Sequence, residues 1–248
     1  MRLALAFLLL CIAVPISHGT ETKKEVLVYS YHLKPPLIVD DKREIGLYFD
    51  IVTYLNEASD EYQFDLVYVP RKRLEVMMQE GTFNGILLGV NPVWFKDRDR
   101  TKYLWTDLVL SDRDELISLK TEPFEFNTPK SLNGKVFGGV RGFYYFGINE
   151  YINAGNALRI DTEREIDLFT LLARSRIDTA LISQSTFDYM IAKNQWHGKF
   201  HVSEKPHDVY DRHILVPKDK ASIFEHINPI VKQLHSDSSW QQTLASYK

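Results

Sequence analysis

Apolar residues recur at helical spacing in two similar stretches of the chain. Each stretch predicts the second half of a helix, then a tight turn, then a short buried strand. A repeated helix-turn-strand unit indicates two similar α/β lobes, and a cleft between lobes is where small ligands usually bind. A chance match within one α/β domain is the alternative. The two stretches consist of Leu74, Met77, Met78, Gly81, Phe83, Asn84 and Leu87, and of Leu168, Leu171, Leu172, Ser175, Ile177, Asp178 and Leu181.

The remaining apolar runs extend this α/β pattern along the whole chain. We expect strands at residues 26–30, 64–69, 85–90 and 135–140, and helices starting at Gly46, at 71–80, at 187–193 and through 221–247. Thr162 and Glu165 match a capping box, which predicts the start of the helix in the second repeat. The turn at 141–145 is expected to lead directly into another helix.

Two long strands are predicted to cross between the lobes. Residues 108–120 read as the outgoing strand and residues 207–216 as the returning one. No Gly/Ser-rich linker interrupts the chain, so strands rather than a tether should form the hinge. We expect one lobe at 20–110 plus 212–248 and the other at 111–211.

The first nineteen residues differ from the rest. Arg2 precedes an apolar run at 3–14, and a small-residue stretch follows from Ser17 to Gly19. This order is typical of a cleavable signal peptide, here 1–19, and predicts a periplasmic protein. The run is shorter than the roughly 20 residues of a membrane span, although an uncleaved anchor is the alternative.

Composition removes several functional classes. The only cysteine is Cys11, so the mature chain has no disulfide and no thiolate metal site. A net charge of −3 without a basic stripe argues against nucleic-acid binding. Neither a G-x-S-x-G nor an H-E-x-x-H motif occurs, so we expect no enzyme, no cofactor and no metal.

Several motifs occur in a recognisable order along the chain. They are Pro35-Pro36 after a strand, Gly46 to Asp50, the first repeat at 74–84, Asp97-Arg98 before 103–106, the pair of segments 132–136 and 139–142, and 176–178. In this order the chain resembles the family 3 extracellular solute-binding proteins, which have the type II periplasmic binding protein fold. The resemblance implies two lobes, each a mostly parallel sheet flanked by helices, that close on a ligand like a Venus flytrap.

Two positions depart from the amino-acid-binding members of that family. Those members grip the ligand carboxylate with an Arg after the first repeat strand, for which Arg98 is the candidate here. The loop before Arg98, however, looks longer than in those members and holds Trp94 and Phe95. Those members also hold the ligand ammonium with an Asp after the second repeat strand, where this chain has Ser183 and Gln184. A neutral pair supplies no charge, so the expected ligand extends to amino-acid derivatives and organic acids.

Candidate ligand-binding residues lie where predicted strands end. The turn at Gly142 is expected to present helix N–H groups to an anion, with a plain tight turn as the alternative. Arg141 and Arg73 are candidate cations, and each could instead be a solvated side chain. Trp94 could stack on a ligand or pin its own loop. The full set is Tyr31, His32, Arg73, Asn91, Trp94, Arg98, Arg141, Gly142, Phe143, Tyr144, Ser183 and Gln184.

The leading functional hypothesis is a monomeric binding protein for uptake of a small polar or anionic solute, with a membrane transporter as its partner. One alternative is a ligand-sensing partner of a membrane receptor. Another is a periplasmic dehydratase-like enzyme on the same fold, which the lack of a paired acid and base disfavours.

Overall fold

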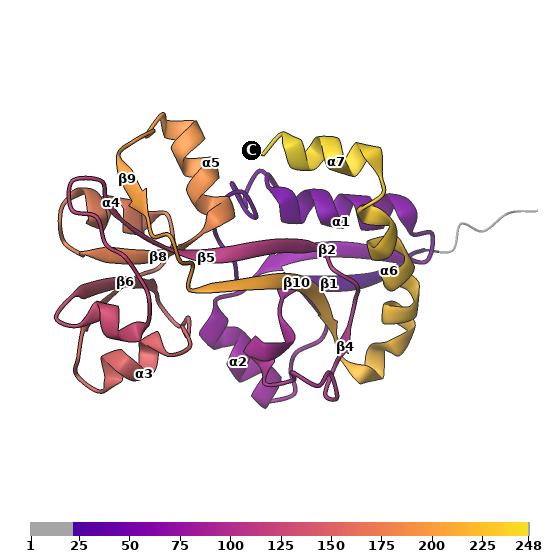
Figure 1. The fold of residues 1–248 in the computed structure, drawn as a ribbon. Helices are drawn as coiled ribbons and strands as arrows, with labels where there is room; N and C mark the ends of the chain where they lie inside the picture. Colours follow the sequence, from indigo (N-terminus) through magenta and orange to yellow (C-terminus); the bar gives the residue numbers. More distant parts are fainter. Residues whose placement is uncertain (1–21, 248) are drawn as a thin grey trace, which may run out of the picture.

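Two long antiparallel strands join the two lobes of the molecule. They are β5 (Leu110–Leu119) and β10 (Asp208–Val216), which lie side by side along the middle of the ribbon in Figure 1. The structure is a computed structural model that describes residues 22–247. The start of β5 pairs with the start of β10, after which β10 continues into one lobe and β5 into the other. The predicted α/β class, with two lobes joined by two strands, is confirmed.

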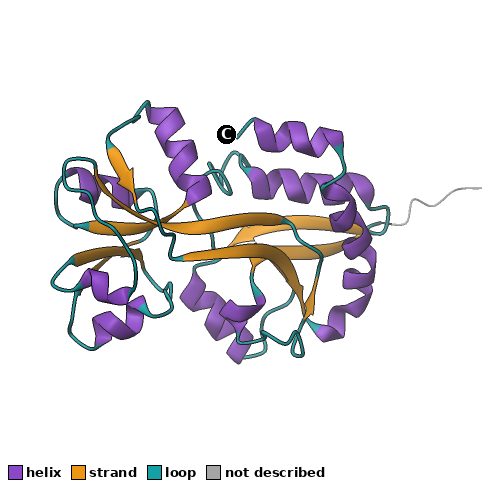
Figure 2. Cartoon of the chain, in the orientation of Figure 1, coloured by secondary structure: helices purple, strands orange, loops and turns teal. Residues whose placement is uncertain are grey.

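The first lobe contains three parallel strands in the order β2-β1-β3, followed by the antiparallel β10. Helices cover both faces of this sheet, as Figure 2 shows. The elements are β1 (Lys24–Ser30), α1 (Leu47–Ala58), β2 (Tyr62–Tyr68), α2 (Arg71–Gln79), β3 (Ile86–Val90), η1 (Pro92–Phe95), β4 (Leu104–Trp105), η3 (Lys218–Lys220), α6 (Ala221–Leu234) and α7 (Ser238–Ala245).

The second lobe repeats this plan. Its parallel strands follow the order β8-β6-β7, and the antiparallel β5 flanks β8. The elements are η2 (Pro129–Leu132), β6 (Val136–Val140), α3 (Ile148–Asn153), β7 (Leu158–Thr162), α4 (Asp167–Ala173), β8 (Thr179–Ser183), α5 (Gln184–Asn194) and β9 (Phe200–Val202). The two sequence repeats correspond to α2 with β3 and to α4 with β8, as predicted.

Each lobe has its own apolar core. In the first lobe the largest cluster joins α1, α6 and α7 to one face of the sheet, around Tyr48, Ile51 and Trp240. In the second lobe two clusters lie around Leu116 and Phe169. Phe143 packs against both second-lobe clusters and also against a first-lobe cluster that contains Tyr31. This side chain therefore forms an apolar contact between the lobes.

Two local predictions were wrong, and one strand was missed. The helix after the Gly142 turn begins only at Ile148, so this turn is no helix N-terminus. Thr162 ends β7 and its hydroxyl donates to the carbonyl oxygen of Arg164 instead of capping a helix. Strand β7 itself was not predicted, because it lies at the sheet edge with Leu158 and Ile160 exposed, so its apolar pattern is weak.

The predicted signal peptide at 1–19 lies outside the described residues. Within residues 22–247, no helix combines the length and the apolar character that crossing a membrane requires.

Candidate functional site

A cavity of about 450 Å³ lies between the lobes. Its walls come from the segments that follow β1 and β2 in the first lobe and β6 and β7 in the second. These segments meet because parallel strands place their carboxyl ends at one edge of a sheet, and here the two edges face each other. The lining residues are Tyr31, His32, Leu33, Lys34, Tyr68, Pro70, Arg71, Lys72, Val140, Arg141, Phe143, Glu163, Arg164 and Glu165.

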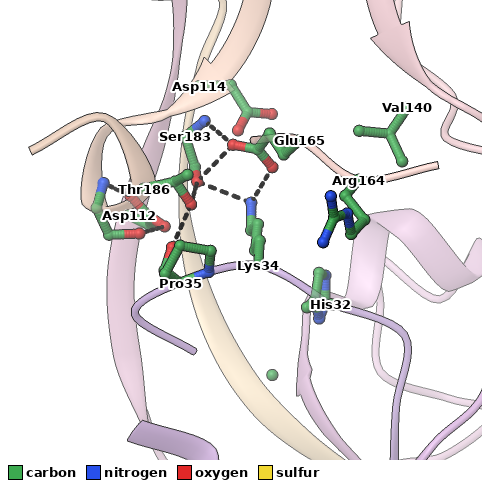
Figure 3. A network of polar contacts seen from close by, with 12 residues as sticks. His32, Lys34, Pro35, Asp112, Asp114, Val140, Arg164, Glu165, Ser183 and Thr186 are labelled. Carbon is green, nitrogen blue, oxygen red and sulfur yellow. Dashed lines mark hydrogen bonds and ion pairs between the residues drawn. The ribbon is translucent and has the colours of Figure 1, made fainter. Parts of the chain in front are cut away.

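Lys34 and Glu165 form a buried ion pair across the cleft (Figure 3). The Nζ atom of Lys34 donates to Oε2 of Glu165 at 2.7 Å and to Oγ of Ser183 at 2.8 Å. Both charged side chains are about 5% exposed. Glu165 also accepts hydrogen bonds from the backbone N–H and hydroxyl of Ser183 through its other oxygen. The carboxylate of the second lobe is thus fully engaged, and it binds an ammonium that belongs to the first lobe.

A second polar contact lies beside this ion pair. The hydroxyl of Thr186, in the first turn of α5, donates to the carbonyl oxygen of Pro35 at 2.6 Å. The hydroxyl oxygens of Ser183 and Thr186 lie 3.0 Å apart. The loop after β1 is therefore bonded to the second lobe at two neighbouring points.

A buried arginine on the hinge strand orients His32. Arg212 Nη1 donates to the carbonyl oxygen of Gly89 at 2.9 Å and lies 3.1 Å from Nε2 of His32. Burial, and then the positive charges of Arg212, Lys34 and Arg71, hold the pKa of His32 well below its usual range, so the ring is neutral. A guanidinium only donates, so Nε2 must accept and the ring proton must sit on Nδ1. That buried Nδ1 has no hydrogen-bond partner in the described part of the chain.

Arg71, the first residue of α2, supplies a fixed cation at the cavity wall. Its Nε donates to Glu75 at 3.0 Å, and its guanidinium carbon lies 4.8 Å from the ring centre of Tyr31 and 4.6 Å from that of Phe95. Lys72 shares the same carboxylate of Glu75. Stacking and pairing hold the planar group in place without neutralising the local charge, because two cations share one anion.

The loop that carries Phe143 is held by another arginine. Arg159 Nη2 donates to the carbonyl oxygens of Val140 and Phe143 at 3.0 and 3.1 Å. The Phe143 ring then meets Tyr31 and His32 edge-on, with centroid distances of 5.7 and 6.1 Å. Arg159 thus positions the aromatic contact between the lobes from outside the cavity.

Asp114 lies on β5 near the ion pair, as Figure 3 shows. Tyr210 on the paired strand donates its hydroxyl to Asp114 at 2.7 Å. Burial raises the pKa of Asp114 to about 6, opposed by the charge of Lys34 and reinforced by that of Glu165. This half-buried carboxyl therefore changes charge near neutral pH beside the contact between the lobes.

Four of the predicted site residues line the cavity: Tyr31, His32, Arg141 and Phe143. Ser183 lies just behind it, bound to Lys34 and Glu165. Trp94 is not among the residues that line the cavity; its ring centre lies 6.2 Å from that of His32 and 4.8 Å from that of Tyr210.

The other predicted residues lie elsewhere. Arg73 is exposed, and Arg71 lines the cavity in its place. Asn91 and Arg98 border a separate, more open cavity of about 370 Å³. Gln184 binds Arg113, and the exposed Tyr144 donates to Glu150. Gly142, at a positive φ of 83°, makes the turn itself.

The predicted set of ligand-binding residues did not include Lys34, Arg71, Arg159, Arg164 or Glu165. Recognition of β7 would have placed Glu165 just beyond the end of a parallel strand, where cleft residues are expected. Nothing in the sequence pairs Lys34 with Glu165. No group of three or more His, Cys, Asp or Glu side chains is arranged to hold a metal ion within residues 22–247.

Comparison with known proteins gives matches among solved structures. A mutant of the arginine-binding protein ArgBP from T. maritima is 17% identical, with 90% of this chain and 94% of that chain covered and a TM-score of 0.71. An ancestral arginine-binding protein bound to arginine is 12% identical, with 91% and 98% covered and a TM-score of 0.71. The GluR0 ligand-binding core with L-glutamate is 17% identical, with 92% and 97% covered and a TM-score of 0.68. No protein-family model and no curated protein sequence matches the chain.

Architecture and matches together define the class of the protein. The chain has the two-lobed type II periplasmic binding protein fold. The resemblance to family 3 extracellular solute-binding proteins is confirmed at the level of the fold.

Proposed function

We propose that this protein is a periplasmic solute-binding protein whose lobes close on a small polar or anionic solute for uptake. The observation that carries the proposal is the cavity of about 450 Å³ that both lobes line. That volume falls within the usual range of small-molecule sites, about 300–1,000 Å³. A ligand that touches both lobes only when they meet shifts the population toward the closed form.

Charge in the cavity supports an anionic ligand. Its lining contains five basic side chains (Lys34, Arg71, Lys72, Arg141 and Arg164) and two acidic ones (Glu163 and Glu165), although the whole chain has a net charge of −3. Glu75 and Asp167 pair with lining cations from outside the cavity, and an excess of positive charge remains even with them included. Local charge of this sign raises the concentration and affinity of anions.

The ionisable groups of the cavity favour binding over catalysis. Lys34 and Glu165 are bonded to each other, and Arg141 pairs with Glu163. General acid–base work needs a titratable group within reach of the substrate, and these groups are already engaged. The related solved structures are binding proteins, and one is the substrate-binding protein of an amino acid ABC transporter. We therefore infer a monomeric, non-enzymatic binding protein with a membrane transporter as its partner, and lobe boundaries at 110/111 and 211/212.

A thermal-shift screen with amino acids, short peptides and organic acids tests this proposal, followed by small-angle scattering with each hit. At saturating concentration we expect at least one class to raise the melting temperature and to reduce the radius of gyration. No stabilisation by any class, together with unchanged scattering, would refute the proposal.

Phe143 and Phe146 provide a matched pair of variants for the same screen. Phe143→Ala removes a ring that contacts Tyr31 and His32, so it should weaken binding of any hit at least tenfold. Phe146→Ala removes a ring that is 79% exposed and should leave affinity unchanged. Equal effects of the two variants would show that the hit binds outside this cavity.

A further inference from the structure

The acidic side chains of the cavity offer little to a ligand ammonium. One oxygen of Glu165 accepts from the backbone N–H and hydroxyl of Ser183, and the other accepts from Lys34. Glu163 is 81% exposed and pairs with Arg141 at 3.3 Å. Among the described lining residues there is thus no buried carboxylate without a cationic partner. An ammonium ligand would have to displace Lys34 or remain in a solvent-screened position.

The Tyr31 ring in the cavity wall already holds a cation. The guanidinium of Arg71 already stacks on the rings of Tyr31 and Phe95. An aromatic face that holds one cation does not hold a second one nearby, because the two like charges repel.

The hydrogen-bond donors of the cavity, in contrast, have capacity left. The buried Nδ1 of His32 has no partner in the described part of the chain, and the contact with Arg212 puts a proton on it. An unpaired buried donor is costly, so an acceptor atom that reached this nitrogen would gain a strong contact. Lys34 uses two of its three N–H donors, on Glu165 and Ser183.

The first turn of α2 adds to this set. Pro70, Arg71 and Lys72 line the cavity, and Pro70 provides no side-chain cap for the helix. Uncapped N–H groups at a helix start favour an anion. His32, whose buried Nδ1 has no hydrogen-bond partner in the described part of the chain, lines the same cavity.

We propose that the cleft selects solutes that carry a carboxylate or a similar oxyanion but no ammonium group, because Lys34 acts as a built-in ammonium on Glu165 and Ser183. This inference rests on the proposed binding function and specifies its ligand class. The ligand's oxyanion lies near His32 and the start of α2. Its remaining, apolar part lies against Phe143 and Tyr68.

Matched pairs of compounds test the inference on the wild-type protein. Titration calorimetry with L-glutamate and glutarate, and with L-phenylalanine and 3-phenylpropanoate, compares an amino acid with its counterpart that lacks the amino group. We expect the counterpart to bind at least tenfold more tightly in at least one pair. Tighter or equal binding of the amino acid in both pairs overturns the inference, although the binding function itself would then stand.

Other outcomes are equally decisive. Absence of binding by both glutarate and 3-phenylpropanoate overturns the inference, because it requires a small carboxylate to bind. If thermal-shift and scattering tests with peptides, sugars and other organic acids also show no response, the proposed function fails with it.

A variant examines the role of Lys34 directly. Lys34→Met removes the ammonium that donates to Glu165 and Ser183, so these two acceptors become available to a ligand ammonium. The preference for the compound without an amino group should therefore fall at least tenfold. Lys42→Met, at an exposed position, should keep the wild-type preference. An unchanged preference in Lys34→Met contradicts the assigned role.

A spectroscopic measurement needs no variant and so does not depend on folding of Lys34→Met. In protein labelled with ¹⁵N-histidine, His32 should show the neutral Nδ1–H tautomer, and its Nδ1 signal should shift when glutarate or 3-phenylpropanoate saturates the site. A protonated Nε2 in the free protein, or no shift on saturation, overturns the assignment of this donor.

Discussion

The ammonium of Lys34 lies 2.7 Å from the carboxylate of Glu165, and these two residues belong to different lobes. The contact holds the lobes together through groups of the protein itself. Removal of one partner from a buried ion pair leaves an uncompensated charge and typically costs about 3–5 kcal/mol. The pair therefore contributes to closure before any solute is bound.

We predict that Lys34→Met shifts the ligand-free protein toward an open form. Its radius of gyration in small-angle scattering should exceed that of the wild type, and its free energy of unfolding should fall by about 3 kcal/mol. The variant Lys34→Met/Glu165→Gln should recover part of that loss, because it leaves no unpaired charge. Lys42→Met serves as the control. A wild-type scattering profile for Lys34→Met would show that the ion pair does not hold the lobes together.

Asp114 should make stability fall as pH rises through the weakly acidic range. The pKa of Asp114 is about 6 in the folded protein, above its ordinary value of 3.8, so the folded state holds this proton more tightly. The stabilisation is fully present below about pH 4 and is lost as pH rises through 6. Urea unfolding should show that ionisation of Asp114 lowers the free energy of unfolding by on the order of 1–2 kcal/mol across this range. This decrease should be smaller in Asp114→Asn. If the pH dependence of the free energy of unfolding is unchanged in Asp114→Asn, groups other than Asp114 cause it.

Asp97 should produce the opposite trend at lower pH. Burial raises the pKa of Asp97, but hydrogen bonds from Trp105 and from the backbone of Lys102, Tyr103 and Thr101 outweigh that effect and lower it to about 2. Its stabilisation is therefore present above about pH 3.8 and disappears as pH falls through 2. Asp97→Ala should cost about 2 kcal/mol at pH 7 and flatten the acid limb of the stability curve. Asp99→Ala, at an exposed position two residues away, should do neither.

Arg159 should affect ligand binding from outside the cavity. Arg159→Ala removes the donors to the Val140 and Phe143 carbonyl oxygens, and this should free the loop that carries Phe143. We expect a loss of stability of about 1–3 kcal/mol and a faster ligand dissociation rate in stopped-flow measurements. Arg174→Ala, an exposed change in the same lobe, is the control. An unaltered dissociation rate in Arg159→Ala would contradict the positioning role.

The sequence was sufficient to predict most of the fold. The buried strand at 86–90 is an apolar run and that at 179–183 has an apolar centre at 180–182, and the helices before them keep a regular apolar stripe. Such signals are local, so they survive without knowledge of the partner elements. Strand β7 gave no such signal because it lies at an edge, and the Thr162–Glu165 motif suggested a helix cap that the structure does not contain.

The site was only partly predictable. Tyr31, His32, Arg141 and Phe143 could be found because they follow predicted strands directly. The sequence could not decide whether Arg71 or Arg73 lines the cavity, because this depends on which side of helix α2 packs against the lobe. Glu165 was assigned a local role, and its actual partner is 131 positions away in the chain.

By itself, the sequence determined the two α/β units, the two crossing strands and the neutral character of Ser183 and Gln184, because each follows from local pattern or residue type. Only the tertiary structure decided which charges meet. The pairing of Lys34 with Glu165 and the proton position on His32 arise from segments brought together by the crossing strands, and electrostatic interactions depend on distance in space and on burial rather than on separation along the chain.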